Sequence, residues 1–212
     1  MCYKYVFIDW YKTLSQSVFW EQFKQDAHPN HHVFDPIQKV LFSESADVIN
    51  QWMRGKLTSE MVVRQLGDAL DFDPEILLRE LILSCQNMRL MSDNSLRFIT
   101  ELRKTGVKVV IATDNMDMFQ RWTVPSLRLA DYVDDILSSC ELGAVKADTD
   151  TTGKNLFFAD YLESNGIGWG ESLLLDDSSE TFGDVIQRCG IDYERVEVGK
   201  LDACLERLLA SS

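Results

Sequence analysis

The sequence has no long hydrophobic run and no signal-like start. No window approaches roughly 18 uncharged apolar residues, the length that a transmembrane helix needs. The N-terminal segment MCYKYVFIDW has no basic stretch followed by a long apolar run, so we expect no signal peptide. These two absences predict a cytoplasmic protein without a membrane partner.

Closely spaced cysteines are also missing. The five cysteines of the chain are Cys2, Cys85, Cys140, Cys189 and Cys204. They are far apart, odd in number and form no Cys-x-x-Cys pair, which argues against a disulfide scaffold and against a structural zinc site. We expect them to be small buried hydrophobic residues in a reducing compartment.

Basic residues are few relative to acidic ones. The chain has 21 Lys and Arg against 34 Asp and Glu, a net charge of −13. It therefore lacks the basic field of a nucleic-acid or anionic-membrane binder, although a local basic pocket for a small anion is still compatible with this charge. With 212 residues, 45% of them hydrophobic, the chain can fold as one domain or one domain with an insert, as a monomer or a homodimer.

Short apolar runs that end in polar residues predict the strands of a buried sheet. Three runs have this form: residues 3–8 before Asp9, 108–112 before Thr113, and 173–175 before Asp176. Residues 136–137 and 195–198 predict two further strands. Apolar residues at helical spacing lie between them, which predicts an α/β protein with a Rossmann-like, doubly wound parallel sheet. In such a sheet the ligand site lies at the carboxyl ends of the strands.

Residues 15–91 have a different pattern, with no convincing strand. Residues 48–53, 59–70 and 74–87 each predict a helix, and Thr58 or Ser59 and Asp73-Pro74 are good helix starts. We therefore expect an all-helical cap domain over residues 15–91. The α/β core domain would consist of residues 1–14 and 92–212, with the cap lying over the strand ends.

The polar residues at the predicted strand ends are candidate functional residues. Asp9 can be a nucleophile, a helix cap or a metal ligand. Thr113 precedes a predicted helix, so its hydroxyl and the following N–H groups suit either a phosphate oxygen or a plain N-cap. Asp176 and Asp177 are adjacent carboxylates that repel each other unless a cation compensates, and Mg²⁺ prefers such oxygen ligands. Lys146 can neutralise a carboxylate and a bound anion.

Together these residues resemble the four motifs of the haloacid dehalogenase-like (HAD-like) hydrolase superfamily. The matching elements are Asp9-Trp10-Tyr11-Lys12-Thr13, Thr113, Lys146 within residues 139–146, and Asp176-Asp177. Their order, spacing and strand context agree with that superfamily over nearly the whole chain. The superfamily commonly carries a helical cap between motifs one and two. The segment WMRGKLT over residues 52–58 is similar to the sequence that is usual in that cap.

The resemblance implies that Asp9 is the nucleophile and that Mg²⁺ is the cofactor. The metal ligands would be Asp9, the backbone carbonyl of Tyr11, and the Asp176-Asp177 pair. Within that pair, Asp177 aligns best with the main metal-binding aspartate, and Asp176 would be its partner.

The resemblance also implies a phosphate site built around Thr113 and Lys146. We extend that site to Asp114 and Asn115, which follow Thr113 directly. Lys146 is thereby both a phosphate ligand and a catalytic residue.

Three residues depart from the pattern of the phosphatases in that superfamily. Tyr11 stands where a second aspartate usually protonates the leaving group and activates water, Lys12 replaces a glycine, and Ala147 replaces a proline. A phenol can donate a proton at neutral pH but is a poor base. We count Tyr11 with Asp9 and Lys146 as the catalytic residues.

The expected function is Mg²⁺-dependent hydrolysis of a small phosphorylated metabolite through an aspartyl-phosphate intermediate. One alternative is a metal-independent haloacid dehalogenase, whose first motif is also Asp-x-Tyr. Its fourth motif is of the Ser-Ser-Asn type, however, and it has an arginine soon after motif one, whereas the first arginine here is Arg54. The other alternative is a catalytically weak phosphate-binding protein, with which the departures from the phosphatase motif at Tyr11 and Lys12 are compatible.

Overall fold

The computed structural model describes residues 3–211, and its centre is a five-stranded sheet. The strands lie in the order β3-β2-β1-β4-β5, and every neighbouring pair is parallel. Their bounds are β1 Tyr5–Ile8, β2 Lys108–Thr113, β3 Asp135–Ser138, β4 Ser172–Asp176 and β5 Asp192–Arg195. The predicted α/β class with a doubly wound parallel sheet is confirmed, and all the strands end on the same edge.

The fifth strand lies three residues earlier than the sequence predicted. Residues 195–198 alternate between polar and apolar, which is why they resembled a strand. The observed β5 starts at Asp192 because it pairs with β4, and the last pair of that ladder is Asp176 with Arg195. Pairing with the neighbouring strand therefore decides where β5 ends, and a single-sequence pattern does not contain that information.

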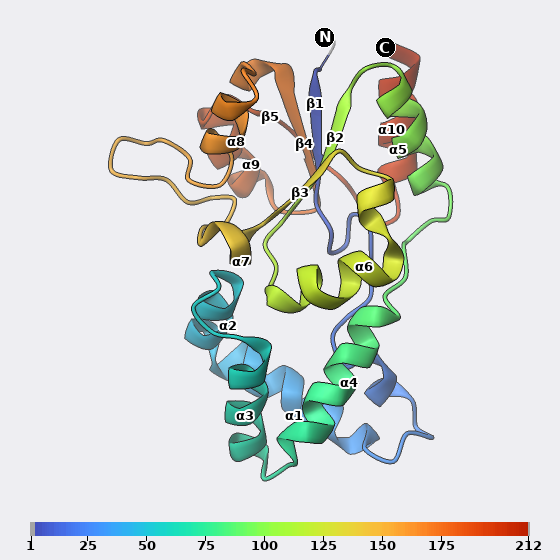
Figure 1. Cartoon of the computed structure of the whole chain (residues 1–212), viewed down its shortest axis with the longest axis vertical. Coiled ribbons are helices and arrows are strands. Elements are labelled where there is room, and N and C mark those ends of the chain that lie inside the picture. Colours follow the sequence, from blue (N-terminus) through green and yellow to red (C-terminus); the bar gives the residue numbers. More distant parts are fainter. Residues whose placement is uncertain (1–2, 212) are drawn as a thin grey trace.

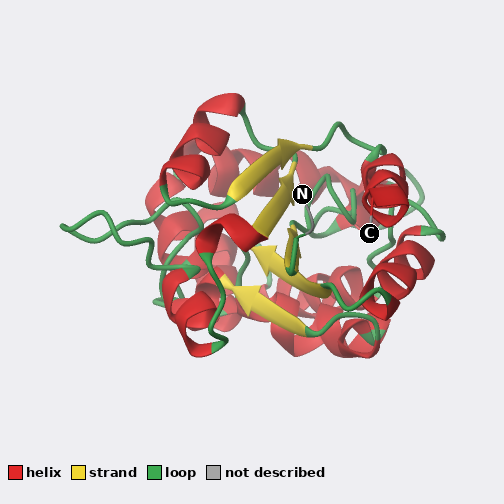
Figure 2. Cartoon of the chain, turned by 90° about the horizontal axis from the view of Figure 1, so that it is seen from above, coloured by secondary structure: helices red, strands yellow, loops and turns green. Residues whose placement is uncertain are grey.

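Successive strand residues alternate between two hydrophobic layers, as the pleat of a strand requires. Val6 and Ile8 of β1 belong to one buried cluster, together with helices α5 (Ser95–Lys104) and α10 (Leu201–Ser211). Phe7 of β1 belongs to the other cluster, and Figure 2 shows helices on both sides of the sheet. That second layer includes α8 (Ala159–Ser164) and α9 (Glu180–Arg188). The short α6 (Val124–Leu127) and α7 (Ser139–Leu142) follow β2 and β3.

The segment between β1 and β2 is helical, as predicted. Within residues 15–91 its α-helices are α1 Phe34–Lys39, α2 Ala46–Met53, α3 Ser59–Leu70 and α4 Pro74–Gln86, and α5 follows them before β2. The predicted helix starts are correct: Thr58 Oγ1 accepts a hydrogen bond from Met61 N at 3.3 Å, and Asp73 Oδ1 accepts one from Glu75 N at 2.8 Å. Helix α1 was not predicted; its Pro36 lies in the first turn, where the missing N–H costs no helical bond.

This helical segment lies beyond the carboxyl ends of the strands, in the lower half of Figure 1. Two short stretches of chain connect it to the sheet, and they pair with each other: Ser15 bridges Leu90, and Met91 N donates to Leu14 O at 2.8 Å. We propose that residues 15–91 form the cap domain, because both crossings lie next to these boundaries.

Two further expectations from the sequence concern membrane-spanning helices and disulfide bonds. No helix within residues 3–211 is long and apolar enough to cross a membrane. The four described cysteines, Cys85, Cys140, Cys189 and Cys204, form no disulfide, and the remaining one, Cys2, lies outside the described residues.

Gly183 of α9 makes a close contact that can be tested. A Cβ atom at this position would lie 2.3 Å from the ring of Tyr193. We expect Gly183→Ala to lower the free energy of unfolding by about 1–3 kcal/mol, because overpacking outweighs the gain in helix propensity. Thermal unfolding with Gly170→Ala as the control checks this, since no atom lies within 4 Å of a Cβ at Gly170. A Gly183→Ala variant as stable as the control would contradict the packing.

Candidate active site

The ends of three neighbouring strands bring together one predicted catalytic residue, one predicted phosphate ligand and one predicted metal ligand. Asp9 follows the last residue of β1, Thr113 is the last residue of β2, and Asp176 is the last residue of β4. Because β1 lies between β2 and β4, the three residues lie side by side at one edge of the sheet. All three are buried, with exposed fractions of 6% or less.

Lys146 joins two of these strand ends. Its Nζ atom donates to Asp9 Oδ1 at 2.6 Å and also to Asp176 Oδ2, and the lysine itself is 3% exposed. Two buried carboxylates would repel each other strongly without a cation between them. The ammonium group of Lys146 therefore makes it possible for Asp9 and Asp176 to be buried together.

The pKa values of these groups follow from burial and from this shared charge. Burial raises the pKa of Asp9 to about 7, although Lys146 opposes the rise. Burial also works to raise the pKa of Asp176, but the charge and hydrogen bond of Lys146 outweigh it and lower the pKa. For Lys146, burial alone would lower the pKa, and the neighbouring carboxylates raise it instead. The carboxylates thus favour the charged form of Lys146, and burial and Lys146 act in opposite directions on the pKa of Asp9.

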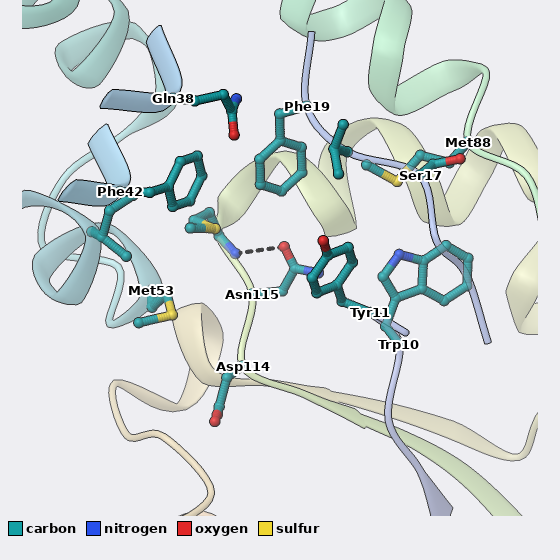
Figure 3. Close-up of a pocket in the computed structure, with 13 residues that line it drawn as sticks. Trp10, Tyr11, Ser17, Phe19, Gln38, Phe42, Met53, Met88, Asp114 and Asn115 are labelled. Atoms are coloured by element: carbon teal, nitrogen blue, oxygen red, sulfur yellow. Dashed lines mark hydrogen bonds between the residues drawn. The ribbon is translucent and has the colours of Figure 1, made fainter. Parts of the chain in front are cut away.

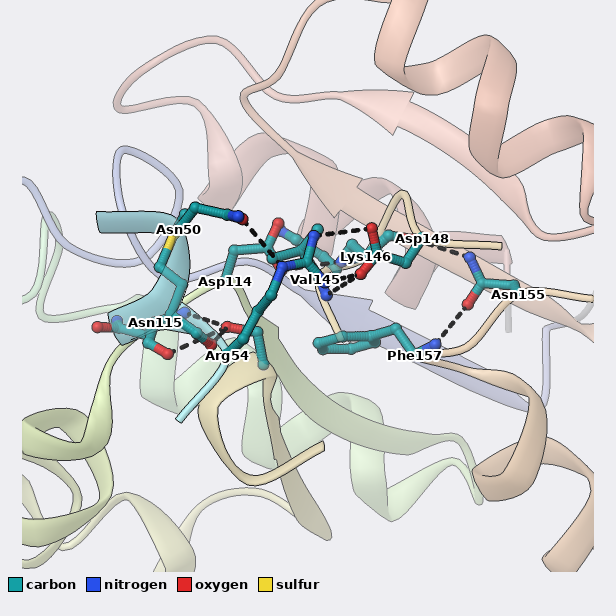
Figure 4. Close-up of polar contacts among 11 residues, drawn as sticks. Asn50, Arg54, Asp114, Asn115, Val145, Lys146, Asp148, Asn155 and Phe157 are labelled. Carbon is teal, nitrogen blue, oxygen red and sulfur yellow. Dashed lines mark hydrogen bonds and ion pairs between the residues drawn. The ribbon is translucent and has the colours of Figure 1, made fainter. Parts of the chain in front are cut away.

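The backbone of Lys146 is fixed from two sides. Its N–H donates to Asp114 Oδ1 at 2.9 Å, and its carbonyl accepts from Asn155 Nδ2 at 2.8 Å. Asn155 is itself held because its Oδ1 accepts from Phe157 N and Phe158 N, at 2.9 and 2.8 Å. These bonds place the lysine next to the strand ends, and Figure 4 shows Asn155 and Lys146 in this network.

Asp9, Asp176 and Asp177 could hold a metal ion between them. One carboxylate oxygen from each lies within 4.8 Å of the others. Asp177 is only partly buried, and burial together with the neighbouring charge of Asp176 raises its pKa. Three carboxylates in a small space fit a hard divalent cation such as Mg²⁺, whose charge would offset their repulsion.

The loop after β1 makes a tight turn at Lys12. Lys12, where the related motif has glycine, has a φ of 63°, in the left-handed region that favours glycine. Lys12 N donates to Ser15 O at 2.6 Å, and Leu14 N donates to Trp10 O at 3.0 Å. The turn therefore forms with a lysine in the glycine position, at a conformational cost of about 1–2 kcal/mol.

The other predicted residues lie around this centre. The Tyr11 side chain is 44% exposed and lines a cavity between the sheet edge and the helical segment. Asp114 faces Lys146, as described, and burial raises its pKa. Asn115 is engaged locally: its N–H donates to Ser139 Oγ at 2.9 Å, and its Oδ1 accepts from Met116 N at 3.0 Å. The binding roles of Thr113, Asn115 and the Tyr11 carbonyl stay predictions.

Several contacts at the site were not expected from the sequence. Arg54, from the segment that follows α2, binds Asp148 with two guanidinium nitrogens, one at 2.9 Å (Figure 4). Ser139 Oγ lies 2.7 Å from Met53 O and 3.0 Å from Asn115 O, and its one hydroxyl proton can be donated to either carbonyl. Both contacts join the helical segment to the loops at the strand ends. Their partners are far apart in the sequence and share no motif with each other, so no local signal could have paired them.

A second group of contacts fastens the helical segment near Asp117. The Asp117 carboxylate accepts hydrogen bonds from Trp52 Nε1 and from Ser59 Oγ, both at 2.7 Å. Arg121 binds Asp117 at 2.7 Å and Glu60 at 2.6 Å. These polar contacts of Asp117 and Arg121 therefore hold the helical segment over the strand ends.

A cavity of about 400 Å³ opens beside these strand ends. Trp10, Tyr11, Asp114 and Asn115 form its side toward the sheet, and residues such as Phe19, Phe42 and Met53 form its other side (Figure 3). A cavity of this size is in the usual range for small-molecule sites, about 300–1,000 Å³. Two of its lining residues, Trp10 and Asp114, directly follow Asp9 and Thr113 in the chain.

Known structures with the same architecture were found by comparison of folds. A HAD family enzyme from Bacteroides thetaiotaomicron superposes with a TM-score of 0.76 at 19% identity, covering 98% of this chain and 100% of that one. A predicted HAD-like family hydrolase from Porphyromonas gingivalis gives 0.72 at 16% identity, covering 98% of each chain. This chain has the HAD-like fold. The similarity extends over nearly the whole chain and therefore includes the helical segment after β1.

Two further structures of the same fold differ in what their names say they bind or act on. The Bacteroides enzyme has also been solved in complex with magnesium and inorganic phosphate, at a TM-score of 0.64 and 15% identity. An L-2-haloacid dehalogenase from Xanthobacter autotrophicus gives 0.63 at 17% identity, covering 92% of this chain and 77% of that one. Comparisons with protein-family models and with curated protein sequences give no match. The structural similarity therefore establishes the fold and leaves the reaction to be argued from the site.

The charge balance around Lys146 can be tested by removing the cation. We expect Lys146→Met to lower the free energy of unfolding by about 3–5 kcal/mol, since Asp9 and Asp176 would stay buried without compensation. Their folded pKa values would rise above the unfolded ones, so the loss should be large at about pH 8.5 and shrink at about pH 5.5, where the carboxylates bind protons.

Urea unfolding at both pH values measures this effect. Lys154→Met is the matched control, because Lys154 is exposed and pairs with Asp160 and Glu163 at the surface. Equal stability losses for the two variants, or a loss that grows as the pH falls, would contradict the proposed role of the buried ammonium group.

Proposed function

We propose that this protein is a Mg²⁺-dependent phosphatase that hydrolyses a small phosphorylated metabolite through an aspartyl-phosphate intermediate. The observation that carries the proposal is the cluster of Asp9, Lys146 and Asp176 at neighbouring strand ends, with Asp177 beside it. Such a cluster combines a nucleophile, a buried cation and carboxylates suited to a metal.

Asp9 is the nucleophile in this proposal. One of its carboxylate oxygens attacks phosphorus while the bond between phosphorus and the alcohol oxygen breaks, and the alcohol oxygen takes a proton from the Tyr11 phenol or from water as it leaves. Water then attacks the phosphorus of the acyl phosphate, which releases inorganic phosphate and regenerates the carboxylate. Lys146 favours the ionised form of Asp9 that this attack needs, because it opposes the effect of burial on the pKa.

The phosphate group would be held by Thr113 and Lys146, with Asn115 beside them. Lys146 supplies positive charge where the transferring group becomes more negative, which is where most catalysis of phosphoryl transfer lies. Asp114 would contribute indirectly, because its carboxylate accepts from the Lys146 backbone. Its own negative charge makes it a positioning residue for Lys146 rather than a direct phosphate ligand.

The residues that would hold Mg²⁺ are Asp9, the Tyr11 carbonyl, Asp176 and Asp177. When bound, the ion would neutralise the charge that these carboxylates and the phosphate bring together. The magnesium and phosphate bound by the Bacteroides enzyme of the same fold support this assignment.

Metal-independent dehalogenation is the second candidate function. The Asp9-Trp10-Tyr11 sequence and the fold shared with the Xanthobacter dehalogenase favour it. The carboxylates of Asp176 and Asp177 and the engagement of Arg54 with Asp148 favour the phosphatase. A protein that binds phosphate but turns it over weakly is the third candidate.

Activity on a panel of phosphorylated metabolites and haloacids, with Mg²⁺ or with EDTA, separates the three candidates. We expect phosphate release with Mg²⁺ and none with EDTA. The variant Asp9→Asn keeps the size of the side chain and removes the attacking charge, so its activity should fall to background with an unchanged circular dichroism spectrum. Haloacid turnover that survives EDTA would identify the dehalogenase. Substantial phosphate release by Asp9→Asn would remove Asp9 from the mechanism.

Tyr11 limits the expected reaction because it replaces the usual acid–base aspartate. Hydrolysis of the aspartyl intermediate should be slow, which gives a burst of alcohol release before the steady state. We expect Tyr11→Asp to raise steady-state turnover of alkyl phosphates by about ten-fold or more, within the usual range for acid–base groups. Rapid-quench kinetics on a simple alkyl phosphate measures both effects. A Tyr11→Asp variant that binds Mg²⁺ but stays inert would favour the phosphate-binding protein.

A further inference from the structure

The cavity beside the strand ends has a lining that is unusual for a site that takes sugars. Nine of the 13 lining residues have large apolar side chains: Trp10, Tyr11, Val18, Phe19, Phe42, Ile49, Met53, Met88 and Met116. Sugars and glycerol would need many hydrogen-bonding partners, which such a wall does not supply. The lining therefore suits the apolar part of a ligand.

Two of these aromatic side chains are exposed to solvent. Among residues 3–211, Tyr11 and Phe42 are the two aromatic residues exposed by more than a third, at 44% and 47%, and both line this cavity. They come from opposite sides: Tyr11 from the loop after β1, and Phe42 from the helical turn Val40–Glu44. Figure 3 shows their rings on either side of the space near Phe19 and Met53. A flat ring between them would cover both.

The volume sets the size of the ring system. A cavity of about 150 Å³ accommodates benzene, and this one measures about 400 Å³. It is therefore large enough for two fused rings or for one substituted ring.

We propose that the cavity binds the alcohol half of the substrate, and that this half is an aromatic ring system of one or two rings joined to the phosphate through a short alkyl link. The inference rests on the proposed phosphatase function, which would place the phosphate at Asp9 and Lys146. The ring lies between Tyr11 and Phe42, and the link crosses from the cavity to the strand ends.

The test compares phosphate esters whose leaving alcohols are of similar acidity. A difference in kcat/KM between them then reflects binding of the alcohol half and not the reactivity of the leaving group. The esters are benzyl and naphthylmethyl phosphate against methyl and glycerol phosphate. We expect kcat/KM to be at least ten-fold higher for the two aromatic esters. Calorimetry with naphthylmethylphosphonate and methylphosphonate, which cannot be hydrolysed, measures the binding part alone and should give at least a ten-fold tighter Kd for the first.

Variants of the wall identify where the ring binds. Phe42→Ala should weaken naphthylmethylphosphonate by about three- to ten-fold, the loss of one aromatic contact, and leave inorganic phosphate binding unchanged. Met61→Ala is the matched control, because Met61 is an apolar residue of α3 with a similar exposure of 45% and does not line the cavity. Ile49→Trp, which fills the cavity, should block the naphthyl compound and spare methylphosphonate.

The outcomes separate this inference from the proposed function. Equal affinity for the naphthylmethyl and methyl compounds would overturn the aromatic site, even if methyl phosphate is hydrolysed. Equal losses in Phe42→Ala and Met61→Ala would also overturn it. Tight, Phe42-dependent binding of the naphthyl compound without turnover of any ester would support the aromatic site and reject the phosphatase.

Discussion

The structure of the site depends on one ammonium group between two buried carboxylates. Lys146 bonds to Asp9 and Asp176, and all three are almost fully buried. Burying any one of these three charges alone would be unfavourable. An isolated buried charge costs several kcal/mol of folding free energy, or the pKa of its group shifts until the group is neutral. The Lys146 ammonium group therefore offsets the repulsion between the two carboxylates and opposes the rise that burial causes in the pKa of Asp9. A bound metal or phosphate would change this balance, which couples ligand binding to the stability of the strand ends.

The parallel sheet is what makes this pairing possible. Asp9 and Asp176 end neighbouring strands whose registers pair Ile8 with Leu175, so their carboxylates reach the same edge without a long loop. Lys146 comes from a loop and needs more support, which the bonds from Asp114 and Asn155 to its backbone supply. Rigid strands thus position the carboxylates, and a hydrogen-bonded loop positions the cation.

Local sequence patterns predicted the parts of this arrangement that local chemistry decides. The strand ends at Asp9 and Asp176, the helix caps Thr58 and Asp73, and the helical segment between β1 and β2 were all readable, because apolar runs and capping residues act over a few positions. The start of β5 was misplaced because its pairing with β4 is a long-range interaction. Asn155 and the contact between Arg54 and Asp148 were missed for the same reason, since their partners belong to no shared motif.

The two sides of the site have different roles, which explains why the sequence did not predict the substrate. The charged groups that would act on a phosphate, Asp9 and Lys146, lie at the sheet edge and follow the recognisable motifs. The cavity that would receive the rest of the substrate is made by side chains from both sides, such as Tyr11 and Phe42, which meet only in the folded chain. Apolar residues in the helical segment look like ordinary core residues in the sequence, and their exposure in the fold is what distinguishes Phe42 from the buried Trp20 and Trp52. Substrate specificity here depends on side chains that meet only in the folded chain, whereas the reactive groups belong to short sequence motifs.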